Sequence, residues 1–417
     1  MSILLKSAKI IDAKSYFNGK NQDILIEKGV ITKISSSIKS KDAKVINLKN
    51  LHVSPGWIDS SVCFGEPGYE DRETIENGIL TAASSGFTDV ILNPYTKPIL
   101  DSRADIGFIK NKSLGSIVDI HPLGSLTRQS KSNELSDLKE MFEAGCVGFY
   151  DFKKPITNPN ILKTALQYVQ HFNGLILSFP LEHSISKNAQ MHEGIISTTY
   201  GLKGFSEISE EIAVLRDLKL LEYTGGKLHF PTISTVNSLN IIKEAKSKGL
   251  NVTCGVSVNN LFFNDEKLKN FDTRFKVNPP IRDEKTRKSL IKGVESRIID
   301  CVTSDHVPVD IDNKKTDFEN SDFGAIGLES AFGALNSLFG VNKTVEILNS
   351  SYEVFDLIRP SINIGNEAKI SMFDPIKKYT FSKNNIYSSS KNSSFLNTDL
   401  TGISIGIISN SKVHIVE

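Results

Sequence analysis

Five side chains that could bind a metal ion or move a proton stand where short apolar runs end in polar residues. They are Cys63, His121, Asp151, Asp305 and His306. A hydrolytic zinc site needs three or more His, Asp, Glu or Cys ligands aimed at one point. Two carboxylates suit a weakly held hard cation and predict a poor zinc site. A lone His is more often a hydrogen-bonded structural residue, and a lone Cys a small buried hydrophobe.

The runs that carry these residues alternate with helix-like segments through the middle of the chain. Eight runs are candidate strands: HVSPGWIDSSV, DVILNP, IVDIHPLGS, CVGFYDF, GLILSFP, KLHFPTIS, NVTCGVS and IIDCVTSDH. Nearly continuous apolar strands in such repeats predict an α/β fold, a parallel (β/α)8 TIM barrel with its functional residues at the C-terminal strand ends. A doubly wound open sheet is the alternative, but no Gly-rich fingerprint follows the first strand.

Amphipathic spacing predicts two of the helices between these runs. One covers Asn133–Ala144 and is ended by Gly145, and the other covers Glu210–Tyr223 and is closed by two glycines. Their apolar positions are Leu135, Leu138, Met141 and Phe142 in the first, and Ile212, Leu215, Leu218 and Leu221 in the second.

Both ends of the chain show partly alternating apolar and polar residues, which is typical of short strands. Residues 1–52 contain ILLKSAKIID and DILIEKGVITKI, and residues 365–417 contain KISMFDP and KVHIVE. We therefore expect one small β-sandwich domain composed of 1–52 and 365–417, beside a barrel of 53–364.

The charge balance and the cysteine count argue against a nucleic-acid-binding, membrane-binding or disulfide-rich protein. Lys+Arg is 49 and Asp+Glu is 48, so the net charge of +1 indicates neither a nucleic-acid nor a membrane partner. Four cysteines in 417 residues do not form a disulfide framework, which fits a reducing cytoplasm. The N-terminal MSILLKSAKIID does not look like a signal peptide.

A series of motifs in order resembles the dihydroorotases, cyclic amidohydrolases of pyrimidine biosynthesis, over nearly the whole chain. The motifs are SPGWID at 54–59, EPG at 66–68, MHEG at 191–194, EYTGGKL at 222–228, IST at 233–235, FKVNPPIR at 275–282, DHVP at 305–308 and FGAIGLE at 323–329. The resemblance is greatest to the long-chain type. The resemblance implies a barrel of the amidohydrolase type and a family whose members bind zinc. In some organisms these proteins have aspartate carbamoyltransferase as a partner.

Four positions match the functional residues of that family. By the resemblance, Asp151 is the acidic ligand after strand four and Asp305 the ligand and general base after strand eight. Asn278 and His306 are the substrate-side residues that match. Asp151 and Asp305 are thus remnants of a metal site, and no bound metal is expected.

Seven other positions depart from the family pattern. The metal-binding histidines fall on Ser61, Cys63, Ser178 and Thr232, the substrate arginine on Gly65, the substrate asparagine on Tyr95, and the second His of the last motif on Val309. Hydroxyls do not replace imidazoles as zinc ligands, and Gly65 cannot supply the bidentate clamp of an arginine.

Three interpretations follow, and the sequence leaves enzymatic activity undecided among them. The first is an inactive homologue that serves as a scaffold or partner, for example of aspartate carbamoyltransferase, or that binds a small ligand. A homo-oligomer is a further expectation. The second is an active dihydroorotase or related cyclic amidohydrolase with a displaced metal site. It would use Asp151, Asp305, His306 and Cys63, with His183 recruited from just after strand five. The third is another ligand-binding or metal-free activity in the same barrel mouth.

Overall fold

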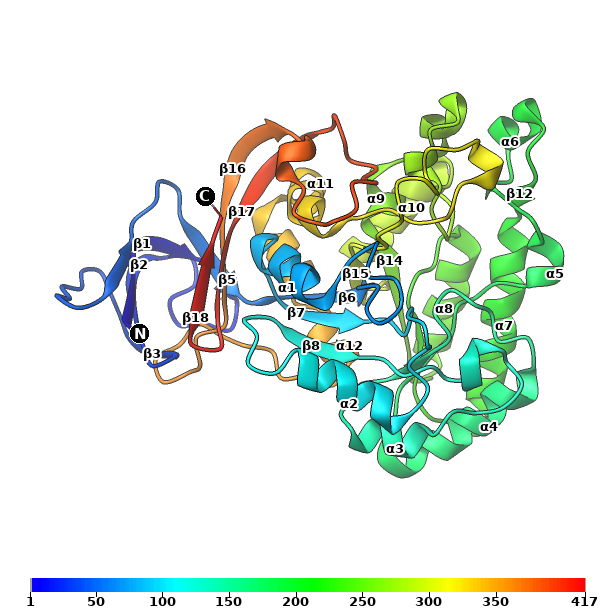
Figure 1. Ribbon diagram of the computed structural model, residues 1–417, viewed down its shortest axis with the longest axis horizontal. Helices are drawn as coiled ribbons and strands as arrows, with labels where there is room; N and C mark the ends of the chain where they lie inside the picture. The colour runs from blue at the N-terminus through cyan, green and yellow to red at the C-terminus, as the bar shows by residue number, and fades with distance from the viewer. Residues whose placement is uncertain (1, 417) are drawn as a thin grey trace.

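A closed barrel of eight parallel strands forms the larger part of the computed structural model, which describes residues 2–416 (Figure 1). Its strands are β6 (Trp57–Val62), β7 (Phe87–Leu92), β8 (Asp119–Pro122), β9 (Phe149–Tyr150), β10 (Ile176–Leu177), β13 (Leu228–Phe230), β14 (Val252–Ser257) and β15 (Cys301–Thr303). Seven of them lie within one of the eight apolar runs, and β7 begins at Phe87, two residues before the run DVILNP. The predicted TIM barrel is therefore confirmed.

The barrel closes through two backbone bridges between its two sheets. Strands β6, β7 and β8 form one sheet, and β15, β14, β13, β10 and β9 form the other. Gly124 bridges to Phe149 at one seam, and Val62 bridges to His306 at the other. Position 306, just after the last strand, therefore lies beside the end of the first.

Helices surround the barrel. They are α1 (Ile75–Ser84), α2 (Arg103–Lys112), α3 (Leu138–Glu143), α4 (Pro159–Val169), α5 (His183–Ser186), α6 (Ile195–Tyr200), α7 (Glu207–Thr224), α8 (Val236–Ser247), α9 (Val258–Phe262), α10 (Glu284–Glu295), α11 (Leu328–Leu348) and α12 (Ser351–Val354). Side-chain caps from Thr74, Ser102, Asn158, Thr235 and Asp283 accept hydrogen bonds from free amides of the first turn. None of the described helices is long and apolar enough to cross a membrane.

The two helices predicted from the sequence both differ from the prediction, one in its length and the other in its buried face. Helix α3 is shorter than predicted because Leu135 forms a bridge with Thr127, which holds the preceding residues in extended backbone. Helix α7 covers the predicted range, but its buried face is rotated. Leu218 and Leu221 are buried, whereas Ile212 and Leu215 are 39% and 47% exposed.

Both termini contribute to one further sheet of eight strands, seen at one end of the molecule in Figure 1. Its strands are β1 (Ser2–Ile10), β2 (Asn21–Glu27), β3 (Val30–Ser35), β4 (Lys44–Ile46), β5 (His52–Pro55), β16 (Ile370–Thr380), β17 (Asp399–Ser409) and β18 (Lys412–Ile415). The two ends meet where β5 pairs antiparallel with β16. The boundaries at 52/53 and 364/365 remain predictions.

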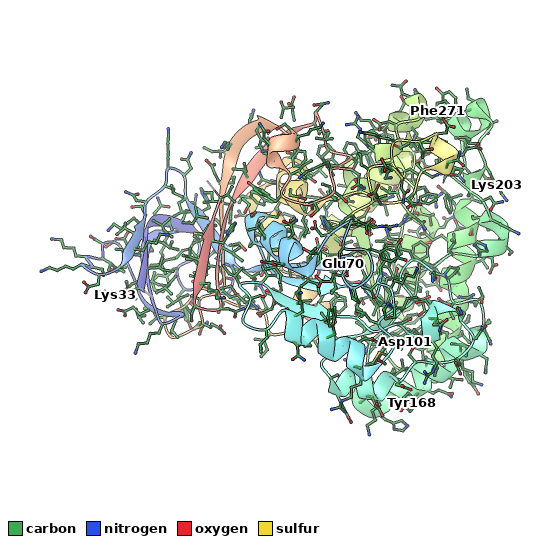
Figure 2. The ribbon with its side chains drawn as sticks, viewed as in Figure 1. Lys33, Glu70, Asp101, Tyr168, Lys203 and Phe271 are labelled. Carbon is green, nitrogen blue, oxygen red and sulfur yellow. The ribbon has the colours of Figure 1, made fainter. Side chains whose placement is uncertain are left out.

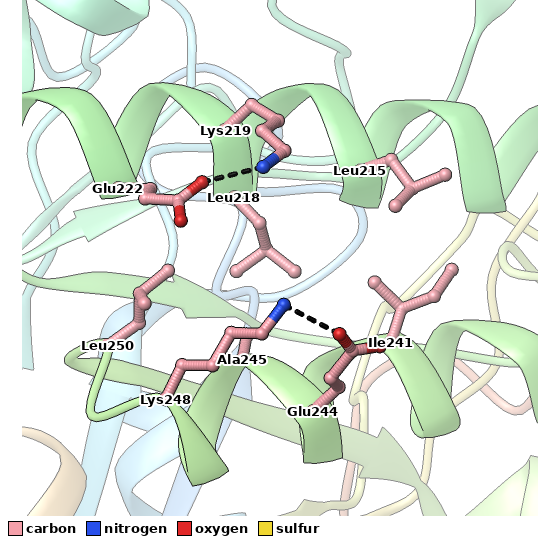
Figure 3. A pocket seen from close by; sticks show the side chains of 9 residues that line it. All are labelled: Leu215, Leu218, Lys219, Glu222, Ile241, Glu244, Ala245, Lys248 and Leu250. Carbon is pink, nitrogen blue, oxygen red and sulfur yellow. Dashed lines mark hydrogen bonds and ion pairs between the residues drawn. The ribbon is translucent and has the colours of Figure 1, made fainter.

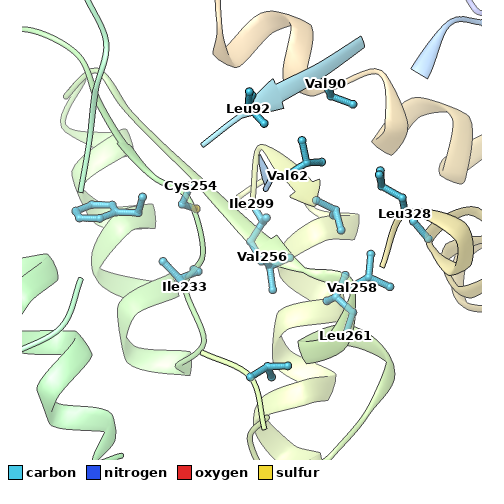
Figure 4. Close-up of a cluster of buried hydrophobic side chains, with 14 of the residues drawn as sticks. Val62, Val90, Leu92, Ile233, Cys254, Val256, Val258, Leu261, Ile299 and Leu328 are labelled. Carbon is cyan, nitrogen blue, oxygen red and sulfur yellow. The ribbon is translucent and has the colours of Figure 1, made fainter. Parts of the chain in front are cut away.

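Apolar packing fixes both parts. Figure 4 shows a section of the largest cluster, where Val62, Val256 and Leu328 pack between barrel strands and outer helices. The indole of Trp57 is fully buried and stacks on Phe332 at 4.7 Å, with Phe373 of β16 at 5.3 Å. The first barrel strand is thereby held to the β-domain. Figure 2 shows polar side chains at the periphery instead, among them the exposed Lys33 and Lys203.

Candidate active site at the barrel mouth

Asp305, at the end of strand eight, is paired with Lys153, a residue that no motif in the sequence had pointed to. The Lys153 Nζ lies 2.7 Å from Asp305 Oδ2, and the Asp305 side chain is only 3% exposed. Its other oxygen, Oδ1, is buried and has no hydrogen-bond partner within residues 2–416. Burial raises the pKa of Asp305, and Lys153 acts in the opposite direction.

Asp151, at the end of strand four, has both oxygens engaged by the loop after strand three. Its Oδ1 accepts hydrogen bonds from Ser125 Oγ at 2.7 Å and from the Thr127 amide at 2.9 Å. The hydroxyl of Thr127 donates to Oδ2. Burial raises the pKa of this carboxyl. The arrangement is that of a carboxylate that anchors a loop.

His306 is buried as a neutral imidazole between two elements. Its Nδ1 accepts from the amides of Gly327, at 3.2 Å, and of Leu328, at the start of α11. Its Nε2 then carries the proton and faces Ser388 Oγ at 3.4 Å. Burial lowers its pKa to about 3. These contacts occupy both ring nitrogens within the protein.

The neutral state of His306 predicts a measurable pH dependence. An unfolded imidazole titrates near 6.5, so the stability that His306 provides is complete above that pH and is lost as the pH falls toward about 3. The stability difference between wild type and His306→Asn should shrink by up to about 1.4 kcal/mol per pH unit in that window. Urea unfolding at pH 7, 5.5 and 4 measures it, and a constant difference would contradict it.

The two positions on strand one hold small groups that bond to their neighbours. The Asn93 amide donates to Ser61 Oγ at 3.0 Å and lies 3.7 Å from Cys63 Sγ. Burial raises the pKa of the Cys63 thiol well above its usual range. A thiol that stays protonated is a poor metal ligand, because the thiolate is the form that binds.

The positions on strands five and six are also buried. Ser178 Oγ donates to Asp217 Oδ2 at 2.6 Å, and Arg216 pairs with the same carboxylate at 2.8 Å. Thr232 Oγ1 and Asn278 Oδ1 have no hydrogen-bond partner among the described residues. A hydroxyl of this kind is no substitute for an imidazole ligand.

An apolar cluster fills the region around these residues. Cys63, Tyr150, Phe152, Phe179 and Val309 belong to one set of buried, packed side chains. The Tyr95 ring packs against that set and lies 5.3 Å from Phe152. Three of the seven departing positions, 63, 95 and 309, therefore contribute to a packed core.

The loop after strand one closes over Gly65. The Tyr69 amide donates to the Gly65 carbonyl at 2.8 Å, and a Cβ at position 65 would lie 2.1 Å from the Tyr69 carbonyl oxygen. The Tyr69 ring then stacks on Tyr95 at 5.8 Å, and the Arg72 guanidinium lies 4.6 Å from the Tyr69 ring. This loop has no room for a side chain at position 65.

The remaining histidines named from the sequence do not complete a metal site. His121 Nε2 lies 2.8 Å from Asp89 Oδ1, in a cluster where Lys369 of the β-domain also binds Asp89. His183 is exposed at the start of α5. Among residues 2–416, no three His, Cys, Asp or Glu side chains come together to hold a metal ion. The donors present therefore do not fit zinc.

Motifs that persist from the family pattern meet in a buried polar network. Arg282 donates to Phe205 O at 2.7 Å, to Ser234 Oγ at 3.0 Å and to His192 Nδ1 at 3.1 Å. Glu210 lies 3.9 Å from Arg282 and accepts from the Ser234 amide at 2.9 Å. Desolvation, with the guanidinium nearby, lowers the pKa of His192 to about 4. These residues tie loops together.

Two surface hollows lie away from the mouth. One, with a volume of about 170 Å³, lies between α7 and α8 and is lined by residues such as Leu215, Lys219 and Glu244 (Figure 3). The other, of about 390 Å³, is bordered by Leu202, Phe271 and 316–319. Neither is lined by Asp151, Asp305 or the departing positions.

Comparison with solved structures shows what the fold is similar to. An L-hydantoinase (dihydropyrimidinase) from Arthrobacter aurescens superposes with a TM-score of 0.85 at 20% identity, over 100% of this chain and 97% of its own. A dihydropyrimidinase from Brevibacillus agri gives a TM-score of 0.83 at 19% identity, over 100% and 95%. The fold is the amidohydrolase type of TIM barrel with an additional β-domain.

Sequence relatives then give the family. A dihydroorotase from Pelotomaculum thermopropionicum is 34% identical over 90% of this chain and 89% of its own. One from Trichlorobacter lovleyi is 31% identical over 99% of both chains. The family model described as dihydro-orotase-like matches residues 51–238. The chain belongs to the dihydroorotase-like family.

Proposed function

We propose that this chain is a catalytically inactive member of the dihydroorotase-like family, working in the cytoplasm as a scaffold or partner. The single observation that carries the proposal is the packing of the barrel mouth. The positions where the family's ligands would stand hold Ser61, Cys63, Ser178 and Thr232, and the space is taken by a buried apolar cluster.

Chemical reasons support the loss of hydrolysis. Such hydrolysis requires a metal-activated water and a polarised carbonyl, and therefore several ligands converging on one point. Here Asp151 is bonded to Ser125 and Thr127, Asp305 to Lys153, and His306 to the start of α11. The candidate groups thus have partners within the chain.

Turnover and metal content of the purified wild-type protein test the proposal. We expect no dihydroorotate hydrolysis above that of buffer and less than one zinc per chain, after growth with and without added zinc. Asp305→Ala is the control, because it should leave any background rate unchanged. Stoichiometric zinc with a rate abolished by Asp305→Ala would instead establish the displaced metal site.

The partner that we propose is aspartate carbamoyltransferase from the same source, by analogy with the long-chain type of this family. Co-purification of the two untagged proteins, followed by light scattering of each alone and of the mixture, tests it. A new species of added mass supports the complex. Separate elution at micromolar concentration argues against it, and a larger mass for this chain alone would indicate a homo-oligomer.

A further inference from the structure

We infer that the Lys153 ammonium is an internal counter-ion, which gives Asp305 the positive charge that a metal ion gives a carboxylate in a hydrolytic site. The inference rests on the proposed function, in which the mouth holds no metal ion. It assigns a role to a residue that lies two positions after Asp151, at the end of β9.

The geometry is that of a mostly desolvated ion pair. Lys153 Nζ and Asp305 Oδ2 are 2.7 Å apart, with the two side chains 13% and 3% exposed. An ionised carboxylate is costly to bury unless it is paired. Asp305 Oδ1 has no partner in the described chain, so Lys153 is the contact that compensates this charge.

The backbone on both sides is set in an uncommon conformation. Lys153 has φ 52° and Asp305 has φ 51°, values that non-glycine residues rarely adopt. Local bonds hold each of them there. The Lys153 amide donates to Tyr150 Oη at 3.1 Å, and the Asp305 amide to Thr303 Oγ1 at 2.9 Å. Such conformations persist only where the surroundings over-determine them.

The groups around the ion pair provide no other positive charge to Asp305 among those that shift its pKa. Cys63 and Tyr150 both have a pKa raised by burial and are neutral at ordinary pH. The Phe152 ring centroid lies 5.4 Å from Lys153 Nζ, on the apolar side. Burial raises the pKa of Asp305, and the charge and hydrogen bond of Lys153 act against that rise.

A double-mutant cycle on the full chain tests the inference. Lys153→Met and Asp305→Asn should each lower the Tm by about 3–5 °C, because each leaves one buried group without its partner. The double variant should recover at least half of the summed loss, because its two groups are neutral. Lys154→Met, at the exposed neighbouring lysine, is the matched control and should shift the Tm by less than about 1 °C.

The outcomes distinguish this inference from the proposed function. Single losses that simply add in the double variant would overturn the role of Lys153 and leave the inactivity proposal standing. If wild type bound zinc stoichiometrically and Asp305→Asn did not, the role of Lys153 as counter-ion would be rejected. Turnover without such binding would overturn only the proposed function.

Discussion

Replacement of Arg282 with Met is expected to lower the free energy of unfolding by about 3–5 kcal/mol, as for other buried charge pairs that lose one partner. Arg282 and Glu210 are 3% and 4% exposed, and their charged groups lie 3.9 Å apart. Without the guanidinium, the Glu210 carboxylate remains buried with hydrogen bonds from Ser234 and Thr235 alone. Phe205 O would lose its donor as well.

Urea unfolding of the purified variants measures this effect. Lys288→Met is the matched control, because Lys288 is 67% exposed and its pair with Glu284 is screened by water. It should cost less than about 0.5 kcal/mol. Arg282→Lys should recover only part of the loss, because an ammonium lacks the planar fork that reaches three acceptors. A cost below about 1 kcal/mol for Arg282→Met would show that the network is not structural.

Replacement of Gly65 with Ala is expected to lower the free energy of unfolding by about 1–3 kcal/mol, the usual cost of overpacking. The added Cβ would lie 2.1 Å from the Tyr69 carbonyl oxygen and 2.8 Å from its carbon. Both atoms are backbone, so no side-chain rotation relieves the clash. Gly65→Arg, whose side chain is longer, should destabilise at least as much for the same reason.

A second glycine provides the control. Gly107 lies within α2, and a Cβ there meets nothing within 4 Å. Gly107→Ala should therefore stabilise the protein by about 0.5–1 kcal/mol through helix propensity. Thermal and urea unfolding of both variants should give opposite signs. Equal stability of Gly65→Ala and wild type would mean that the loop opens easily and could accept a ligand.

Arg282 and Gly65 have different structural roles in the motif segments. Arg282 belongs to the FKVNPPIR motif and Glu210 to α7, outside the motifs, and both are held by bonds that need no substrate. Gly65 lies between Asp59 and the EPG motif, where the backbone of Tyr69 packs directly against it. Both positions are therefore held by contacts within the chain itself.

Local sequence pattern was enough for the barrel strands but not for every helix. The apolar runs predicted all eight strands because a strand buried on both faces must be almost continuously apolar. The helix predicted from Asn133 begins at Leu138 instead, because the bridge between Leu135 and Thr127 competes with helical bonding. The helical spacing of apolar residues carries no information about such a contact between neighbouring segments.

The sequence by itself determined the barrel, the family resemblance and the identities of the groups at each strand end. Only the tertiary structure decided what those groups do. Asp151 bonds to a loop, His306 caps α11, and Asp305 pairs with Lys153. Lys153 carried no signal in the sequence, because a lysine after a strand is usually solvated. Its partner lies 152 residues away, and the closure of the barrel brings them together.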